Sequence, residues 1–312
     1  MVERWRLRTA PLVLLLALVA GCAPPATAPA APVPVAAPAG MPPAAAPVAP
    51  APSGQPPGAQ PPGAQPPGAQ ASAAPLPAAV RLLQLNLCSS GIAACYTGRS
   101  TAEAAALLRA ETPDLVTLNE VCGDDVEVLE RALAEAVPGA EVTSAFQPAR
   151  DATTGEPYRC RNGEQYGNGL LSRWAATAEG GIHPAQDPAD PEQRSWLCLD
   201  VASPAVSACT THLAYTRRDV AVAQCRFLFD EVVAPRRERT PVVVGGDLNL
   251  GPADGPDLVS CFPAGSTAVD DGGGPQVVVA APGLAVAASG TIDLRGATDH
   301  PGLLVTLGVS PG

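Results

Sequence analysis

Residues 242–250 read VVVGGDLNL, so an acid and an amide follow directly behind a short apolar run. The three valines predict a buried β-strand. Because residues two apart in an extended strand face the same way, we expect Asp247 and Asn249 to point into one cleft at the tip of this strand. Gly245 and Gly246 are expected to let the backbone turn there without strain. The stretch therefore predicts a strand that delivers polar side chains to a site.

Four other segments combine an apolar strand with a polar group that can contact a metal or a phosphate. They are residues 81–87 with Asn86, residues 114–120 with Glu120, residues 206–212 with His212, and residues 302–307 preceded by Asp299 and His300. Taken singly, such groups are more often turn residues, solvated strand ends or caps. Strand ends of one sheet share an edge, however, and ligands favour that edge. With two of the chain's three histidines among them, the five segments together predict one functional site.

The segments between these strands indicate the class of fold. Helices are expected at residues 101–110, with Ser100 as the N-cap, at residues 124–136 and at residues 217–233. Further strands are expected at residues 166–173 and, as an antiparallel hairpin, at residues 195–201 and 206–212. Such a hairpin does not belong to a doubly wound parallel sheet. The pattern therefore predicts an α/β sandwich of two sheets with helices on the outside.

The first 79 residues are unlike a folded domain. Residues 1–22 join arginines to an apolar run that is too short for a stable bilayer span and ends in LVAGC. This resembles a bacterial lipoprotein signal, in which Cys22 is lipidated after cleavage, with an ordinary secretory cleavage as the alternative. Residues 23–79 carry no charge, are mostly Ala and Pro, and repeat QPPGA three times, which predicts an extended spacer. We expect an exported protein, either anchored by lipid on the extracytoplasmic face or secreted.

Residues 80–312 remain as one domain, which is large enough to bury its own core. It contains no lysine and holds 29 acids and 16 arginines, a net charge of −13. A protein that grips nucleic acid through a broad basic face has the opposite balance. An acidic domain still binds phosphate where a metal and a few arginines are concentrated in one cleft.

Eight cysteines remain besides Cys22, and an even number in an exported protein indicates disulfides. The sequence alone does not fix the connectivity. The pairs favoured by local geometry are Cys88 with Cys95 across a short loop and Cys198 with Cys209 across the hairpin, which leaves Cys122 with Cys160 and Cys225 with Cys261. A zinc site is the alternative, and the absence of any Cys-x-x-Cys pair disfavours it.

Six short motifs occur in an order that is typical of one superfamily. They are NL at 86, LNE at 118–120, GNGLLSR at 167–173, THL at 211–213, GGDLN at 245–249 and TDHPG at 298–302. In this order they resemble the endonuclease/exonuclease/phosphatase superfamily, which includes pancreatic-type deoxyribonuclease, apurinic endonucleases, neutral sphingomyelinases and inositol polyphosphate 5-phosphatases. The resemblance spans residues 81–307, and it implies a four-layer sandwich of two stacked mixed sheets flanked by helices.

The resemblance also implies chemistry, namely hydrolysis of P–O bonds with Mg²⁺, or with Mn²⁺ or Ca²⁺. Mg²⁺ takes oxygen ligands, which Glu120, Asn86 and Asp299 would supply. His300 would take a proton from the attacking water, with Asp299 beside it. His212 would donate a hydrogen bond to a non-bridging phosphate oxygen as negative charge develops.

The remaining motif residues would position the reacting groups. Asp247 would orient the nucleophile or a histidine, and Asn249 would hold the phosphate. Asn168 and Arg173, from the GNGLLSR motif, would add contacts to the substrate phosphate.

One departure from the family pattern concerns the last histidine. Family members usually carry a further Asp on the strand before the final DH, paired with that histidine. Here the strand QVVVA, at residues 276–280, has no acid at the expected place. Either Asp293, the nearby acid, has taken this role, or His300 lacks a carboxylate partner.

The sequence therefore predicts a metal-dependent phosphoesterase that hydrolyses phosphodiester bonds. The leading hypothesis is an extracellular nuclease. A sphingomyelinase-like esterase of phospholipids or inositol phosphates is the first alternative. The second is a catalytically silent binding module on the cell surface, for which the missing strand acid is the best support. The expected partners are a phosphate ester, in nucleic acid or a phospholipid head group, and a membrane through the lipid anchor. We expect a monomer.

Overall fold

The computed structural model describes residues 76–249 and 259–309. These residues belong to the second of two units into which the chain divides, Pro67–Gly312. The predicted signal segment with Cys22, and the predicted spacer up to residue 75, lie outside the described residues. None of the described helices is both long and apolar enough to cross a membrane.

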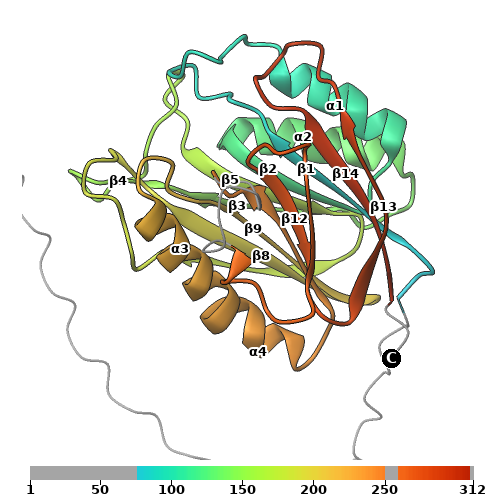
Figure 1. The fold of residues 1–312 in the computed structure, drawn as a ribbon. Coiled ribbons are helices and arrows are strands. Elements are labelled where there is room, and N and C mark those ends of the chain that lie inside the picture. Colours follow the sequence, from blue (N-terminus) through green and yellow to red (C-terminus); the bar gives the residue numbers. More distant parts are fainter. Residues whose placement is uncertain (1–75, 250–258, 310–312) are drawn as a thin grey trace, which may run out of the picture. The chain divides into compact units, whose positions relative to one another are not determined.

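Two six-stranded sheets form the centre of the second unit (Figure 1). The first has the order β13-β14-β1-β2-β5-β3, with β1 (Val80–Asn86), β2 (Leu115–Cys122), β3 (Thr143–Pro148), β5 (Tyr166–Ser172), β13 (Leu284–Ile292) and β14 (Gly302–Val309). The second has the order β11-β12-β10-β9-β8-β6, with β6 (Ala176–Ile182), β8 (Ser195–Ala202), β9 (Ala205–His212), β10 (Val242–Asp247), β11 (Thr267–Asp270) and β12 (Gln276–Ala280). Strands β4 (Arg150–Asp151) and β7 (Glu192–Gln193) form a small separate pair.

Helices cover the outer face of each sheet. On the first sheet lie α1 (Ser100–Glu111) and α2 (Gly123–Ala136). On the second lie α3 (Arg218–Phe227), the π-helical segment η1 (Leu228–Val233) and α4 (Ala234–Arg237). Figure 1 shows the two groups of helices on opposite sides of the stacked sheets. The predicted four-layer α/β sandwich is therefore confirmed.

The alternation of side chains along β1 explains the layering. Leu83 and Leu85 pack among residues of α1 and α2, whereas Leu82 packs among residues of the second sheet. Gln84 and Asn86 follow on the same side as Leu82, because side chains two apart on a strand share a face. Towards one end of the strands, the space between the sheets thus changes from apolar to polar.

Asn119 is the centre of this polar layer and is fully buried. Its Oδ1 accepts hydrogen bonds from the Gln84 side chain at 2.8 Å and from the Asp247 backbone amide at 2.7 Å. Its amide donates to Asn168 at 2.8 Å and to the Thr211 carbonyl at 3.1 Å. A buried polar group is costly unless it is paired, so these bonds hold the two sheets at one separation.

The glycines of the VVVGGD strand allow neighbouring strands to pack closely against it, and they do not form a turn. Gly245 and Gly246 both lie within β10, and neither has a positive φ. A Cβ atom at Gly245 would lie 2.4 Å from Oγ1 of Thr117, on the other sheet. A Cβ atom at Gly246 would lie 2.3 Å from the carbonyl oxygen of Thr211, on β9. The expectation that these glycines relieve strain in a turn is therefore wrong; they make room for neighbouring strands.

The four predicted disulfides are confirmed. They are Cys88–Cys95, Cys122–Cys160, Cys198–Cys209 and Cys225–Cys261. The third joins residues directly opposite each other on β8 and β9. The second ties the end of β2 to the loop before β5, and so fixes the chain that follows Glu120.

Two local predictions need correction. Ser100 is the first residue of α1 rather than its N-cap; the cap is Arg99, and no side chain caps the helix there. The helix expected at residues 217–233 is interrupted, because α3 changes at Leu228 into the π-helical segment η1. The long strand β13 was not expected, since most of its residues are small and exposed and it lacks a buried apolar face.

Candidate active site

The carboxyl ends of four central strands meet at the polar end of the sandwich. β1 and β2 run parallel, with Asn86 opposite Asn119, and β9 and β10 run parallel, with His212 opposite Asp247. The loop before β14 joins them, because the hydroxyl of Thr298 donates to the carbonyl of Asn86 at 3.0 Å. The predicted residues of five segments thus come together at one end of the fold.

Glu120 reaches the site through an irregularity in β2. The register between β2 and β5 shifts between Leu118 and Val121, and Glu120 has a φ of 54°. Asn119 already faces the second sheet, so regular alternation would turn Glu120 towards the helices. The left-handed backbone instead directs the carboxylate into the pocket. Such a conformation is costly for a residue with a side chain and is often found at functional sites.

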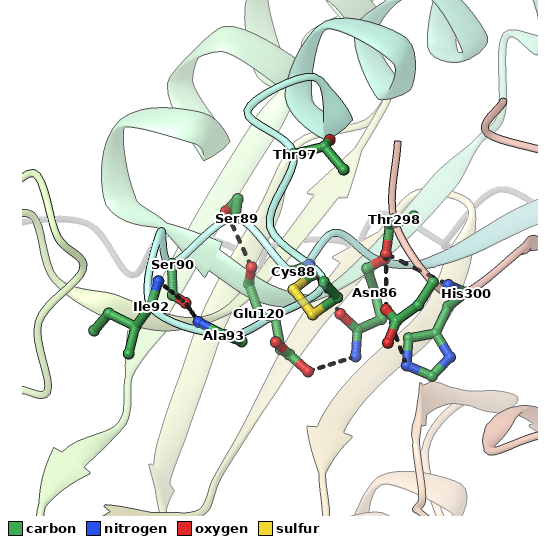
Figure 2. Close-up of a disulfide and its surroundings, with 12 residues drawn as sticks. Asn86, Cys88, Ser89, Ser90, Ile92, Ala93, Thr97, Glu120, Thr298 and His300 are labelled. Carbon is green, nitrogen blue, oxygen red and sulfur yellow. Dashed lines mark hydrogen bonds and ion pairs between the residues drawn. A yellow bond between two sulfur atoms is a disulfide. The ribbon is translucent and has the colours of Figure 1, made fainter. Parts of the chain in front are cut away.

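Asn86 bridges two carboxylates, one half-buried and one buried. Its amide donates to Oε1 of Glu120 at 2.9 Å and to Oδ2 of Asp247 at 2.8 Å, as Figure 2 shows for Glu120. Its Oδ1 accepts the backbone N–H of Cys88 at 3.1 Å, at the start of the loop closed by the Cys88–Cys95 disulfide. In this arrangement Asn86 positions Glu120 and Asp247 with its nitrogen, and its role as a metal ligand stays a prediction.

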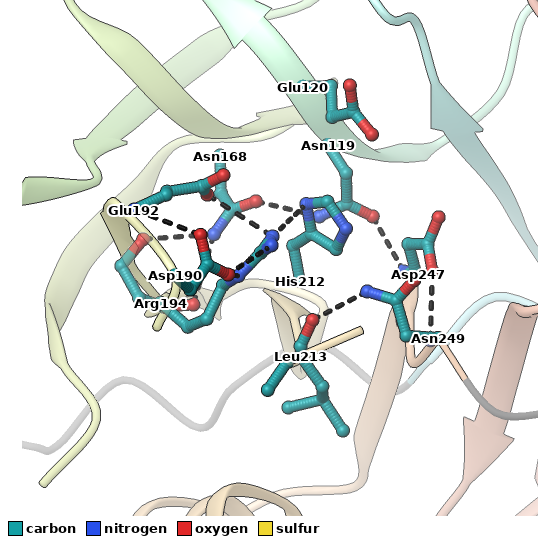
Figure 3. Close-up of polar contacts among 12 residues, drawn as sticks. Asn119, Glu120, Asn168, Asp190, Glu192, Arg194, His212, Leu213, Asp247 and Asn249 are labelled. Carbon is teal, nitrogen blue, oxygen red and sulfur yellow. Dashed lines mark hydrogen bonds and ion pairs between the residues drawn. The ribbon is translucent and has the colours of Figure 1, made fainter. Parts of the chain in front are cut away.

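His212 lies at the end of β9 and is only 6% exposed. Its Nδ1 lies 2.9 Å from Nη1 of Arg194 (Figure 3). A guanidinium can only donate, so Nδ1 accepts and the proton of the neutral ring sits on Nε2. Burial first, and the positive charge of Arg194 second, lower the pKa of His212 to about 3. His212 is thus a neutral donor whose N–H direction is fixed.

Arg194 is held by two acids and was not predicted from the sequence. Its guanidinium contacts Oδ2 of Asp190 at 2.8 Å and Oε1 of Glu192 at 3.3 Å, and all three side chains are largely buried. Burial raises the pKa of Glu192 to about 7, and Arg194 opposes this only in part. The three residues precede a predicted strand in the DPADPEQRSW stretch. No local pattern there indicates that this arginine packs against a histidine 18 residues later.

His300 lies among carboxylates. Its Nε2 is 3.7 Å from Oδ2 of Asp247 and 3.7 Å from Oδ1 of Asp299. Both distances are too long for a hydrogen bond, so the ring lies beside the two acids without a direct bond to either. The side chain of His300 is 21% exposed. Burial opposes ionisation of Asp247, but His212, the Asn86 amide and His300 together hold its pKa below the ordinary value.

Asn249 borders the same pocket, although not for the expected reason. β10 ends at Asp247, and Asn249 has a φ of 56°, so strand alternation does not direct it. Its backbone amide donates to Oδ1 of Asp247 at 2.9 Å, and its side-chain amide donates to the Leu213 carbonyl at 2.6 Å. Its Oδ1 is left to meet a ligand.

Two predicted phosphate contacts are not brought to the pocket. Asn168 is buried beneath it, where its amide donates to Ser195 and its oxygen accepts from Asn119. Arg173 lies just beyond the far end of β5 and pairs with Asp114 at 2.9 Å. The physical reason is strand direction: β5 runs antiparallel to β2, so its beginning, Tyr166, lies at the site. Asp293 is also elsewhere; it is exposed and accepts the backbone N–H of Arg295.

A pocket of about 520 Å³ opens at this end of the strands. It is lined by Glu120, His212, Asn249 and Asp299, by the acidic network around Arg194, by Tyr158, Tyr166 and Tyr215, and by the Cys95 loop. Tyr215 is 60% exposed, and the Arg194 guanidinium lies 5.6 Å from its ring centre. The pocket thus places a hydrogen-bond donor, carboxylates and aromatic rings around one space.

The donor set fits a hard divalent cation. Glu120 and Asp299 offer carboxylate oxygens to one pocket, the ligand type that Mg²⁺ and Ca²⁺ prefer. Burial raises the pKa of Glu120, and the neighbouring charge of Asp247 raises it further. A bound cation would relieve this accumulation of negative charge.

The layered fold and the pocket at its strand ends define a class of hydrolytic phosphoesterases. The chain belongs to the Endonuclease/Exonuclease/phosphatase family, whose model matches residues 83–300. No curated protein sequence matches it significantly.

Solved structures share this fold. An endonuclease/exonuclease/phosphatase from Beutenbergia cavernae is 23% identical with a TM-score of 0.56, over 75% of this chain and 72% of the other. The human Nocturnin catalytic domain, solved with a bound sulfate anion, is 13% identical with a TM-score of 0.58, over 74% and 94%. TDP2 from D. rerio, complexed with a single strand DNA product, is 16% identical with a TM-score of 0.53, over 75% and 100%. At these identities the likeness concerns the fold.

Proposed function

We propose that this protein is an exported nuclease that hydrolyses phosphodiester bonds with a divalent cation, Mg²⁺ first and Mn²⁺ or Ca²⁺ as alternatives. The observation that carries the proposal is the pocket itself. His212, a neutral histidine with a fixed N–H, lines it together with the carboxylates of Glu120 and Asp299, and a second histidine, His300, lies 3.7 Å from Asp299. A donor, a base and a cation each assist the hydrolysis of a phosphodiester, and this site offers groups for all three.

Each side chain then has one task. Glu120 and Asp299 would hold the cation, which would stabilise negative charge on the phosphate when bound. His300 would accept the proton of the attacking water at Nε2, the ring nitrogen on the side of the two aspartates. His212 donates from Nε2 to a non-bridging oxygen, which carries more negative charge in the transition state than in the substrate. Asp247 orients the attacking water or a histidine. Asn249 would hold the phosphate with its side-chain amide, which would have to leave the Leu213 carbonyl, because Oδ1 can only accept hydrogen bonds.

The aromatic lining favours nucleic acid over a lipid head group. Tyr215 is exposed at the pocket, and Tyr158 lines it as well. Stacking of a base on such a ring contributes about 1–3 kcal/mol and tolerates any base. The solved TDP2 structure with a single strand DNA product shows that a protein of this fold can hold a single strand. The domain's acidic charge favours a short contact around one unpaired nucleotide over a long basic groove.

The four disulfides support export, because disulfides persist in oxidising compartments. The signal at residues 1–22 and lipidation at Cys22 complete the proposal. An extended spacer would then hold a monomeric enzyme away from the membrane.

The test uses supercoiled plasmid DNA and a single-stranded oligonucleotide with Mg²⁺, with and without a chelator. We expect cleavage that a chelator and His300→Ala both abolish, while Arg173→Ala, at the far end of β5, cleaves like the wild type. Vesicles containing sphingomyelin or phosphatidylinositol form a parallel arm. Hydrolysis of the lipid without cleavage of either DNA would replace the nuclease by the lipid esterase, and no hydrolysis of any arm would favour the silent binding module.

A further inference from the structure

Strand β12, where the resemblance leads us to expect an acid beside the last histidine, begins with a neutral side chain. Gln276, the first residue of β12, lies opposite Asp247 of β10. Its amide donates to Oδ2 of Asp247 at 2.8 Å, and its oxygen accepts from Gln84 at 2.9 Å. Gln276 therefore extends the polar layer and offers no negative charge to His300.

The carboxylate of Asp271 lies just beyond the end of β11, the strand that pairs with the other edge of β12. β11 pairs antiparallel with β12, with Asp270 opposite Val277, and the backbone N–H of Asp271 donates to the carbonyl of Gln276 at 3.1 Å. The register thus continues by one residue and places Asp271 opposite Gln276. Residues opposite each other across strands have side chains on the same face of a sheet. Asp247, Gln276 and Asp271 therefore form one row on the face that holds the site.

The carboxylate of Asp271 has an unused acceptor. Its Oδ1 is buried and has no hydrogen-bond partner among the described residues. A Cβ atom at Gly274 would lie 2.3 Å from this oxygen, so the DGGG turn folds around the carboxylate only because glycine stands there. Burial raises the pKa of Asp271, whereas nearby backbone N–H groups and the charge of His300 lower it. Because a buried unpaired oxygen is costly, its position calls for a partner.

We propose that Asp271 is the carboxylate that orients His300, in place of the acid that β12 lacks. The ring of His300 turns Nε2 towards Asp247 and Asp299, and no hydrogen bond to a described residue engages its Nδ1. Asp271 accepts the Nδ1–H, directly after a side-chain rotation or through one water molecule. This contact keeps Nε2 unprotonated and stabilises the ring once it has taken the proton of the water. The inference rests on the proposed role of His300 as the general base.

The kinetic test uses the whole protein with Mg²⁺ and bis(p-nitrophenyl) phosphate, a phosphodiester without a nucleobase. Asp271→Asn is expected to lower kcat about 10- to 100-fold and to leave KM within about twofold. Asp270→Asn is the matched control, because it makes the same charge change in the same turn one residue away; it should leave kcat within about twofold. In the background of His300→Ala, Asp271→Asn should cost nothing further, since a residue that acts through His300 has no effect without it. Equal kcat for the two Asn variants, or a full additional loss in the His300→Ala background, would overturn the proposal.

A spectroscopic test does not depend on turnover. The chain has three histidines, so the ring ¹⁵N signals of labelled protein resolve into three sets, and His300→Ala assigns one of them. Asp271→Asn should shift the signals of His300 and spare those of His183, whose Nε2 contacts Thr211 at 2.8 Å. Unchanged His300 signals would refute the contact. If the wild type hydrolyses no phosphodiester, the proposed function fails while the ring signals still decide the role of Asp271.

Discussion

The two histidines of the pocket stand in opposite electrical surroundings. His212 is 6% exposed and accepts a hydrogen bond from Arg194 on its hidden nitrogen. His300 is 21% exposed and faces Asp247 and Asp299. Both come from loops or strand ends at the same edge of the sandwich, so the difference lies in their neighbours.

This contrast assigns the two rings different tasks. Burial and a positive partner together keep the pKa of His212 low, so its ring stays neutral and can donate a hydrogen bond at any working pH but cannot act as a base. His300 has carboxylates rather than an arginine as neighbours, which leaves the role of general base to this ring. Similar residues in one pocket thus receive separate roles from their environments.

The largest expected effect comes from removing the proposed base. His300→Ala should lower kcat by on the order of 100- to 10,000-fold, and His212→Ala by about 100- to 1,000-fold. Added imidazole should restore part of the activity of His300→Ala, because that space opens to solvent, and none of His212→Ala, whose buried ring served as a fixed donor. Kinetics with bis(p-nitrophenyl) phosphate measure both. Rescue of His212→Ala instead would reverse the two roles.

A second substitution, at Arg194, removes the positive neighbour that distinguishes His212 from His300. Arg194→Met removes the donor to Nδ1, so the pKa of His212 should rise from about 3 and its N–H direction is no longer fixed. We expect kcat to fall about 10- to 100-fold. Arg236→Met is the control, because Arg236 is equally buried but pairs with Glu179 and Asp200 on the second sheet. Comparable losses in folded samples of the two variants would mean that Arg194 serves stability alone.

The sequence was sufficient to predict that the side chains at the carboxyl ends of parallel strands lie at one edge of the fold. Asn86, Glu120, His212 and Asp247 each follow an apolar run, and β1, β2, β9 and β10 all point to one edge. The same reasoning failed for Arg173, because the direction of β5 depends on its pairing with β2, and nothing within the segment encodes it.

Residues whose roles depend on contacts between distant elements could not be predicted from the sequence either. Arg194 meets His212 only because β8 and β9 lie side by side. The role of Gly245 depends on how closely the two sheets approach, a distance set by side chains such as Thr117 on the opposite sheet. Asp293 looked suitable because it is close to His300 in sequence, yet the chain turns it to solvent. Position along the chain is a poor guide where strands cross from one layer to another.

A smaller effect concerns stability and the acid beside Arg194. Burial raises the pKa of Glu192 from its ordinary value of 4.5 to about 7. Below pH 4.5 both the folded and the unfolded chain hold this proton; as the pH rises towards 7 the unfolded chain releases it first, so stability falls. Glu192→Gln, which still accepts a hydrogen bond, should flatten this decline by on the order of 1–3 kcal/mol. Urea unfolding at pH 5 and pH 8 measures it, and parallel curves for the two proteins would contradict the shift.

The smallest effect is expected at the opposite end of the strands. Arg173 pairs with Asp114, whose other oxygen accepts the backbone N–H of Arg81 at 2.8 Å. The side chain of Arg173 is 38% exposed, so Arg173→Ala should cost no more than about 1 kcal/mol. Because β5 carries it away from the pocket, both kcat and KM should stay at wild-type values. A raised KM for a phosphodiester would mean that the substrate reaches along the whole sandwich, and the separation between a catalytic end and a structural end of these strands would have to be abandoned.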